Sequence, residues 1–121
     1  MKMCDEMIKL RKKLDEIGIA WQDNSYSTPE NVVEELVRLG HERQYCDVTI
    51  YRTHFIINDV RYSVINGYGT YGGYDPFLDK NDGLLEVMTE TLNGGDPIGY
   101  MTADDLIKTI FGRKKNAFED N

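Results

Sequence analysis

The sequence predicts an α+β fold in which about four helices cover a small, mainly antiparallel sheet. Two runs rich in β-branched and aromatic residues, 46–57 and 60–65, flank the turn-forming pair Asn58-Asp59 and predict a central hairpin. Runs with apolar residues at three- and four-residue spacing lie before and after it and predict helices. Because 121 residues suffice for one hydrophobic core, we expect a single domain over 1–121, with a tail that frays from about residue 113.

Two helices are predicted before the hairpin. The first covers residues 5–17, which carry one apolar face, and Gly18 ends it because glycine readily takes the left-handed conformation. A short strand is predicted over 19–21. The second helix covers 29–40, and Pro29 suits its first turn.

The predicted hairpin has two chemically different faces. If Asn58-Asp59 is a two-residue turn, residues 55 and 62 are cross-strand neighbours. One face then carries apolar residues that we expect in the core: Phe55, Ile57, Val60, Tyr62 and Val64. The opposite face carries four polar residues between isoleucines: Arg52, His54, Arg61 and Ser63.

The second half of the chain is predicted to mix a loop, two helices and an edge strand. Residues 66–75 are rich in glycine and are expected to form a loop. Apolar residues at helical spacing predict a third helix over 81–92. An edge strand is expected over 98–101, and Thr102 is expected to cap a fourth helix that Gly112 ends.

The chain is acidic, with a formal net charge of −7 and a pI near 4.7. This charge repels phosphates, so we expect no direct DNA binding and no binding to a membrane surface. The acidity would suit a mimic of nucleic acid or a ligand for a basic cleft, but solubility alone is the simpler explanation of it, because acids and bases are interleaved. No apolar signal stretch occurs at the start, and Cys4 and Cys46 are the two cysteines, so a cytoplasmic location with reduced thiols is expected.

No motif predicts a metal, a cofactor or catalysis. His41 and His54, with the two cysteines, lack the spacing of zinc ligands. Ser63 is expected opposite His54, but no orienting acid is evident, which favours a structural hydrogen bond over a nucleophile. Gly67-x-Gly69-x-x-Gly72 matches the dinucleotide-binding pattern, but the residues after it do not predict the helix that this motif needs.

The glycine- and tyrosine-rich stretch 66–74 is the first candidate binding element. Its glycines let a backbone approach a ligand closely, and its tyrosines offer flat apolar faces, so it could contact a base or a protein surface. The alternative is a structured turn whose tyrosines pack on the core. The candidate binding residues are Asn66, Gly67, Tyr68, Gly69, Thr70, Tyr71, Gly72, Gly73 and Tyr74.

The second candidate element is the small basic cluster of Arg52, His54 and Arg61. If this strand face borders the loop, cations and backbone N–H groups converge, which suits an anionic ligand. The alternative is that the arginines pair with acids on neighbouring helices.

Four segments of the sequence carry a resemblance. These are RTHF (52–55), SVINGYGTYGGYD (63–75), GLLE (83–86) and GDPIGYMTADDLI (95–107). Through them the chain resembles small accessory proteins encoded by phages and integrated prophages. The resemblance implies an anti-defence role in a bacterial cytoplasm and supplies no catalytic residues.

Two functional hypotheses follow. The first is a non-catalytic protein that binds and neutralises a host defence protein, as anti-CRISPR proteins do. It depends on the acidity, the absence of a catalytic motif and the glycine-tyrosine loop. The alternative is a protein that sequesters an anionic nucleotide between that loop and the three basic residues.

Overall fold

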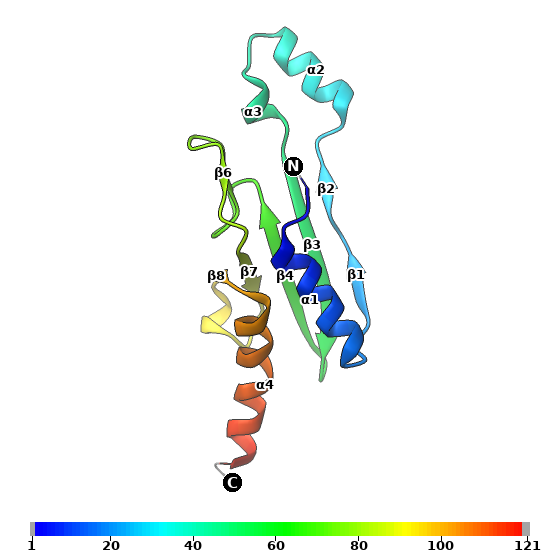
Figure 1. Ribbon diagram of the computed structural model, residues 1–121, viewed down its shortest axis with the longest axis vertical. Helices are drawn as coiled ribbons and strands as arrows, with labels where there is room; N and C mark the ends of the chain where they lie inside the picture. The colour runs from blue at the N-terminus through cyan, green and yellow to red at the C-terminus, as the bar shows by residue number, and fades with distance from the viewer. Residues whose placement is uncertain (1, 120–121) are drawn as a thin grey trace.

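An antiparallel sheet forms the centre of the molecule (Figure 1). The computed structural model describes the backbone of residues 2–119 and the side chains of residues 2–112. The sheet has six strands in the order β1-β3-β4-β7-β8, and β2 also pairs with β3. These strands are β1 (Trp21–Asp23), β2 (Tyr26–Ser27), β3 (Thr49–Ile57), β4 (Val60–Gly67), β7 (Leu85–Met88) and β8 (Ile98–Met101). The predicted α+β class with a mainly antiparallel sheet is confirmed.

The remaining elements lie around this sheet. The helices are α1 (Asp5–Glu16), α2 (Glu30–Arg38), α3 (Arg43–Cys46), the short 3-10 helix η1 (Asn93–Gly95) and α4 (Ala103–Glu119). A second, two-stranded sheet consists of β5 (Tyr74–Asp75) and β6 (Lys80–Asn81). The helix expected over 5–17 and the edge strand expected over 98–101 are therefore present.

The central hairpin has the predicted register. Phe55 pairs with Tyr62, and their rings stack with centroids 5.2 Å apart. Asn58 and Asp59 both have positive φ angles, 51° and 66°, as a type I′ turn requires. The first strand begins at Thr49 rather than at Cys46, because residues 43–46 form α3.

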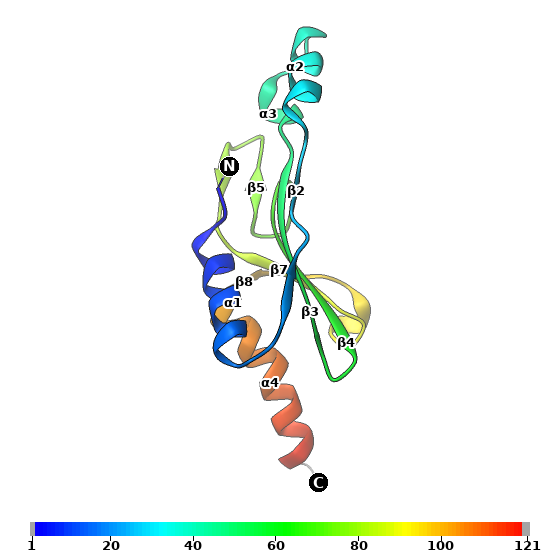
Figure 2. The same ribbon diagram turned by 90° about the vertical axis from the view of Figure 1, so that its right-hand side faces the viewer.

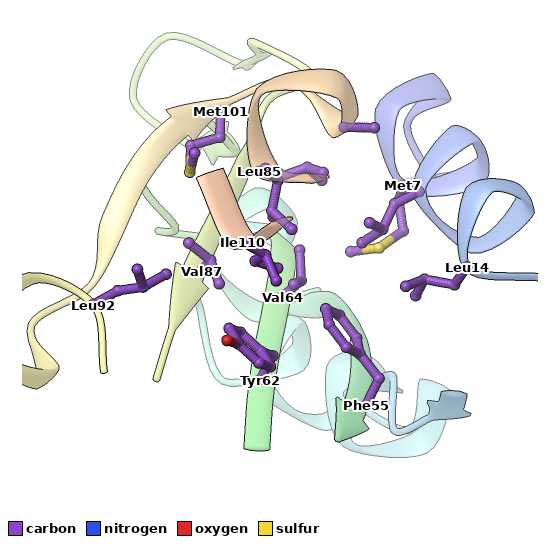
Figure 3. Close-up of a cluster of buried hydrophobic side chains, with 13 residues drawn as sticks. Met7, Leu14, Phe55, Tyr62, Val64, Leu85, Val87, Leu92, Met101 and Ile110 are labelled. Carbon is purple, nitrogen blue, oxygen red and sulfur yellow. The ribbon is translucent and has the colours of Figure 1, made fainter. Parts of the chain in front are cut away.

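The core lies between one face of the sheet and the helices α1 and α4 (Figure 2). Phe55, Tyr62 and Val64 from the hairpin are buried there, as expected. Figure 3 shows how Met7 and Leu14 of α1 and other side chains meet over the sheet. Thr102 caps α4 as predicted, because its Oγ1 accepts a hydrogen bond of 3.1 Å from the N–H of Asp105.

The helix predicted over 81–92 is wrong. Residues 85–88 form β7, which pairs with β4 on one side and with β8 on the other. Leu85 and Val87 point into the core, whereas Met88 is 46% exposed. These residues have helical spacing, but their side chains alternate between the two sides of the sheet as in a strand. The segment forms a strand because β4 offers an edge with which it can pair.

The predicted helix end at Gly112 is also wrong. α4 continues through this residue to Glu119, and a Cβ atom at position 112 would meet no other atom within 4 Å. Glycine lowers helix propensity but does not by itself end a helix. The helical backbone therefore includes residues 113–119 of the tail that was expected to fray, and residues 120–121 lie outside the described part of the chain.

The helix predicted over 29–40 is present as α2, but it does not cover the sheet. The ribbon of β2 and β3 carries α2 and α3 away from the core (Figures 1 and 2). Val33 and Cys46 are buried in this part, yet neither belongs to the core cluster. We call this part, residues 29–47 with the neighbouring hairpin 74–82, the distal end. The prediction that all helices cover the sheet thus holds only for α1 and α4.

Candidate functional site

The four polar residues predicted on one face of the hairpin lie on the face opposite the core. Register pairs His54 with Ser63 and Ile56 with Arg61, so the side chains of these residues project from the same side of β3 and β4. Within the described residues, α1 and α4 pack on the other side (Figure 2). We call this surface the outer face.

A hydrogen-bonded relay crosses the outer face. Asn24 Nδ2 lies 2.6 Å from His54 Nδ1, and His54 Nε2 lies 3.1 Å from Ser63 Oγ. An amide NH2 group only donates, so Nδ1 accepts, Nε2 carries the ring proton, and Ser63 Oγ accepts it. A serine nucleophile needs the opposite polarity, in which the ring accepts the hydroxyl proton. With this polarity, the hydroxyl hydrogen of Ser63 is available to a further acceptor.

The surroundings of His54 favour its neutral form. Burial of the ring lowers the pKa of His54 below its usual 6.5, and the charges of Arg52 and Arg61 lower it further. The imidazole is therefore uncharged at neutral pH. The predicted basic cluster then carries two cations, from its arginines, and one neutral ring.

Arg52 sits differently from Arg61, although both were predicted in one cluster. The guanidinium of Arg52 stacks over the ring of Tyr26 at 5.3 Å, and its Nε atom is buried without a hydrogen-bond partner. Arg61 is exposed. None of the ion pairs within the described part of the chain involves Arg52 or Arg61, so the alternative of pairing with neighbouring helices has no support there.

Two cavities adjoin Arg61. One, of about 610 Å³, lies at the β1 edge, and its lining includes Trp21, Asn24 and His54. The other, of about 410 Å³, lies between the outer face and the segment 89–95, which follows β7. We call the second one the β7 cavity. It is lined by Val60, Ser63, Met88, Thr89, Glu90 and others.

The glycine-tyrosine loop is a tightly packed turn. A Cβ atom on Gly67 would collide with the backbone of Thr49, and one on Gly73 would collide with Thr70 and with the backbone of Gly67. Gly72 has a φ angle of 93° and lies against Leu84. These glycines are therefore required by the local packing.

Most backbone N–H groups that could bind an anion in this loop already donate within the protein. Gly67 donates to Thr70 Oγ1 at 3.1 Å, and Gly73 donates to the carbonyl oxygen of Thr70 at 2.9 Å. Gly69 donates to the carbonyl oxygen of Tyr74 at 2.9 Å, and Tyr71 donates to a carboxylate oxygen of Glu86 at 2.8 Å. Asn66 is buried and bonds to Asn81 through its amide.

The tyrosines of the loop are paired with other aromatic rings. The ring centroids of Tyr68 and Tyr74 lie 6.2 Å apart, and those of Tyr71 and Tyr100 lie 6.5 Å apart. The hydroxyl of Tyr74 donates a hydrogen bond to Asp79. The pKa of Tyr74 is raised to about 12, mainly by this bond. Tyr71 is 56% exposed and is thus the loop tyrosine most available for contact.

The loop and the basic residues do not converge on one spot. Gly67 lies opposite Ile50, at the end of the hairpin remote from its turn, whereas Arg61 lies next to the turn. Gly67 follows Arg61 by six positions along the strand, which is a distance of roughly 20 Å. Arg52, opposite Ile65, is the residue of the cluster nearest to the loop.

No family model, curated protein or solved structure matches this chain. The assignment of a function therefore depends on the molecule's own geometry. Among the described residues, no group of His, Cys, Asp and Glu could hold a metal ion, and no helix is long and apolar enough to cross a membrane.

The distal end exposes apolar side chains that were not predicted as part of a site. Six large apolar residues are exposed there: Val32, Val37, Leu39, Tyr45, Phe77 and Leu78. Phe77 and Leu78 are 82% and 72% exposed, and the ring centroids of Phe77 and Tyr45 lie 5.7 Å apart. Gln44 Nε2 also bonds to the carbonyl oxygen of Pro76 at 3.4 Å. The apolar pair Phe77-Leu78 within a polar hairpin was the available signal.

The distal end also carries most of the net negative charge. Residues 29–47 and 74–82 contain eight acids and three Lys or Arg residues, which leaves −5 of the chain's formal −7. Each of these three bases pairs with an acid of the same end: Arg38 with Glu35, Arg43 with Glu30, and Lys80 with Asp82. Exposed apolar groups are thus surrounded by excess carboxylates.

Proposed function

We propose that this chain is a non-catalytic, phage-type accessory protein that binds a host protein through its distal end. The single observation that carries the proposal is the exposure of Phe77 and Leu78 beside Tyr45. Aromatic and large apolar side chains at the centre of an interface supply most of its binding energy. The surface of a lone domain seldom exposes such groups together without a partner.

The charge of the distal end defines the partner's chemistry. A net −5 around apolar groups is complementary to a basic surface with an apolar centre. We propose a basic protein of the bacterial cytoplasm, such as a nucleic-acid-binding component of host defence, as the occupant. The chain would neutralise this host protein by covering the basic surface with which the host protein binds nucleic acid.

The nucleotide alternative has less support. It requires the glycine-tyrosine loop and the basic residues to enclose one ligand, yet Arg61 lies roughly 20 Å from the start of the loop. It also requires free loop N–H groups, and those of Gly67, Gly69 and Gly73 donate to protein acceptors. A protein partner at the distal end requires neither.

Photo-crosslinking followed by titration tests the proposal. Benzoylphenylalanine replaces Phe77 in one variant and Ile8 in another, because Ile8 is 53% exposed but lies on α1. In bacterial cells we expect a covalent adduct with a basic protein from position 77 and none from position 8. The adduct identifies the protein, which is then purified for calorimetry.

The titration decides the outcome. The double variant Phe77→Ser, Leu78→Ser should weaken binding of the purified partner more than tenfold, with an unchanged unfolding midpoint. Ile8→Ser should bind as the wild type does, and affinity should fall with rising salt. Equal affinity of the double variant and the wild type would remove the distal end from the interface and overturn the proposal.

A further inference from the structure

The β7 cavity is a pocket that the proposed interface does not use. It lies on the outer face, where the segment around η1 projects from the side of β4 that faces away from α1 (Figure 2). Its volume of about 410 Å³ is within the range of small-molecule sites, which is roughly 300–1,000 Å³. The distal end is at the other extreme of the hairpin.

Thr89 forms part of the wall of this cavity. Its side chain is 6% exposed, and its Oγ1 atom is buried without a hydrogen-bond partner among the described residues. Because this atom has almost no solvent-accessible surface, a ligand in the cavity cannot bond to it, and the polar contacts must come from other residues of the lining.

Two hydrogen-bond donors line the cavity, Ser63 and Arg61. The relay from Asn24 through His54 makes Ser63 Oγ an acceptor toward the ring, which frees its hydroxyl hydrogen. Arg61 contributes an exposed guanidinium that forms no ion pair within residues 2–112. A guanidinium and a hydroxyl together suit a carboxylate, which arginine binds through two parallel hydrogen bonds.

The rest of the lining opposes a simple anion. Asp59 and Glu90 are exposed acids that line the cavity and would repel a ligand that carries negative charge alone. They would attract an ammonium group. Val60 and Met88 add apolar surface, and the methionine sulfur favours aromatic contacts.

We propose that the β7 cavity binds a free amino acid with an apolar side chain. Its carboxylate lies on Arg61 and the hydroxyl of Ser63. Its ammonium group lies against Asp59 and Glu90, and its side chain lies on Val60 and Met88. A zwitterion is the chemical class that satisfies the cation and the carboxylates of this lining at once.

Three probes of one shape test the proposal on the full chain. L-Phenylalanine carries both charges, 3-phenylpropionate carries only the carboxylate, and phenethylamine carries only the ammonium group. We expect saturable amide shifts in ¹H–¹⁵N spectra at Ser63 and Thr89 with phenylalanine, and at least fivefold weaker binding of each analogue. No saturable shift with phenylalanine, or equal binding of either analogue, overturns the proposal.

Matched variants assign the contacts. Arg61→Gln should weaken phenylalanine binding about tenfold, whereas Arg38→Gln at the distal end should leave it unchanged. Ser63→Ala removes the second donor and should weaken binding at least threefold. Unchanged affinity in both Arg61→Gln and Ser63→Ala, in samples whose spectra show the native fold, excludes the cavity as the site.

Discussion

At the scale of single residues, His54 illustrates how a neighbour sets a protonation state. Burial lowers its pKa, and two arginines add positive charge on the same face. We predict that Arg61→Gln raises the pKa of His54 toward its usual value, because one repelling cation is removed. An NMR titration of the imidazole Cε1–H resonance measures this, with Arg38→Gln as the control. A pKa that stays or falls in Arg61→Gln contradicts the prediction.

The same shift has a consequence for stability. Because the pKa of His54 in the folded chain lies below the unfolded value of 6.5, the unfolded chain binds the proton first as the pH falls. The stability tied to the neutral ring is thus complete above pH 6.5 and is lost as the pH falls from there through the folded pKa. Replacement by a residue that does not titrate, as in His54→Gln, should remove this component from the pH dependence.

Residue-scale prediction from the sequence succeeds where the constraint is local. The period of two in a strand is enough to place Arg52, His54 and Arg61 on one face. It cannot supply Asn24, because this partner of His54 lies 30 residues earlier in the chain and arrives through the pairing of β1 with β3. The group that fixes the tautomer of His54 is thus a tertiary contact.

At the scale of elements, the hairpin and β7 show opposite outcomes. The turn Asn58-Asp59 encodes its own conformation through two residues that tolerate positive φ, so the hairpin is predictable. The sequence of β7 fits a helix and a strand equally well by spacing. The edge of β4 decides between them, and no local pattern reports which edge is available.

A pair of substitutions distinguishes the strand from the helix. Residues 85 and 88 would share a face of a helix, but in β7 they point to opposite sides. Leu85→Ala should therefore cost about 2–5 kcal/mol, because Leu85 is fully buried. Met88→Ala should cost less than about 1 kcal/mol. Urea unfolding measures both, and similar costs at the two positions would contradict the observed register.

At the scale of the whole molecule, the sequence predicts α2 but not its location. Apolar residues of this helix share one face, which indicates that the helix packs against something. Amphipathicity does not identify the partner. In the fold that partner is mainly α3, so Val33 is buried while Val32 and Val37 remain substantially exposed. The exposed residues become part of the surface proposed for binding.

The separation of Val33 and Cys46 from the core cluster also determines how the molecule opens. The nine residues of α2 are too few for an isolated helix to be stable, so its amides depend on α3 and on exposed ion pairs such as Arg43 with Glu30. Native-state hydrogen exchange should show α2 amides exchanging by local opening, while those of β3 and β4 exchange only on global unfolding. Leu14→Ala should accelerate only the β3 and β4 amides, whereas Leu36→Ala should accelerate both groups, because global unfolding also breaks the contacts of Leu36. One common opening free energy for both groups would contradict this.

Two cooperative units in one short chain then have separate roles in recognition. The proposed partner would add contacts to the distal end, so part of its binding energy would stabilise α2 and α3 against local opening. Association should therefore slow the exchange of the α2 amides, and also that of the sheet amides, because global unfolding releases the partner as well. A partner would thus select among local states of the distal end while the core remains unchanged.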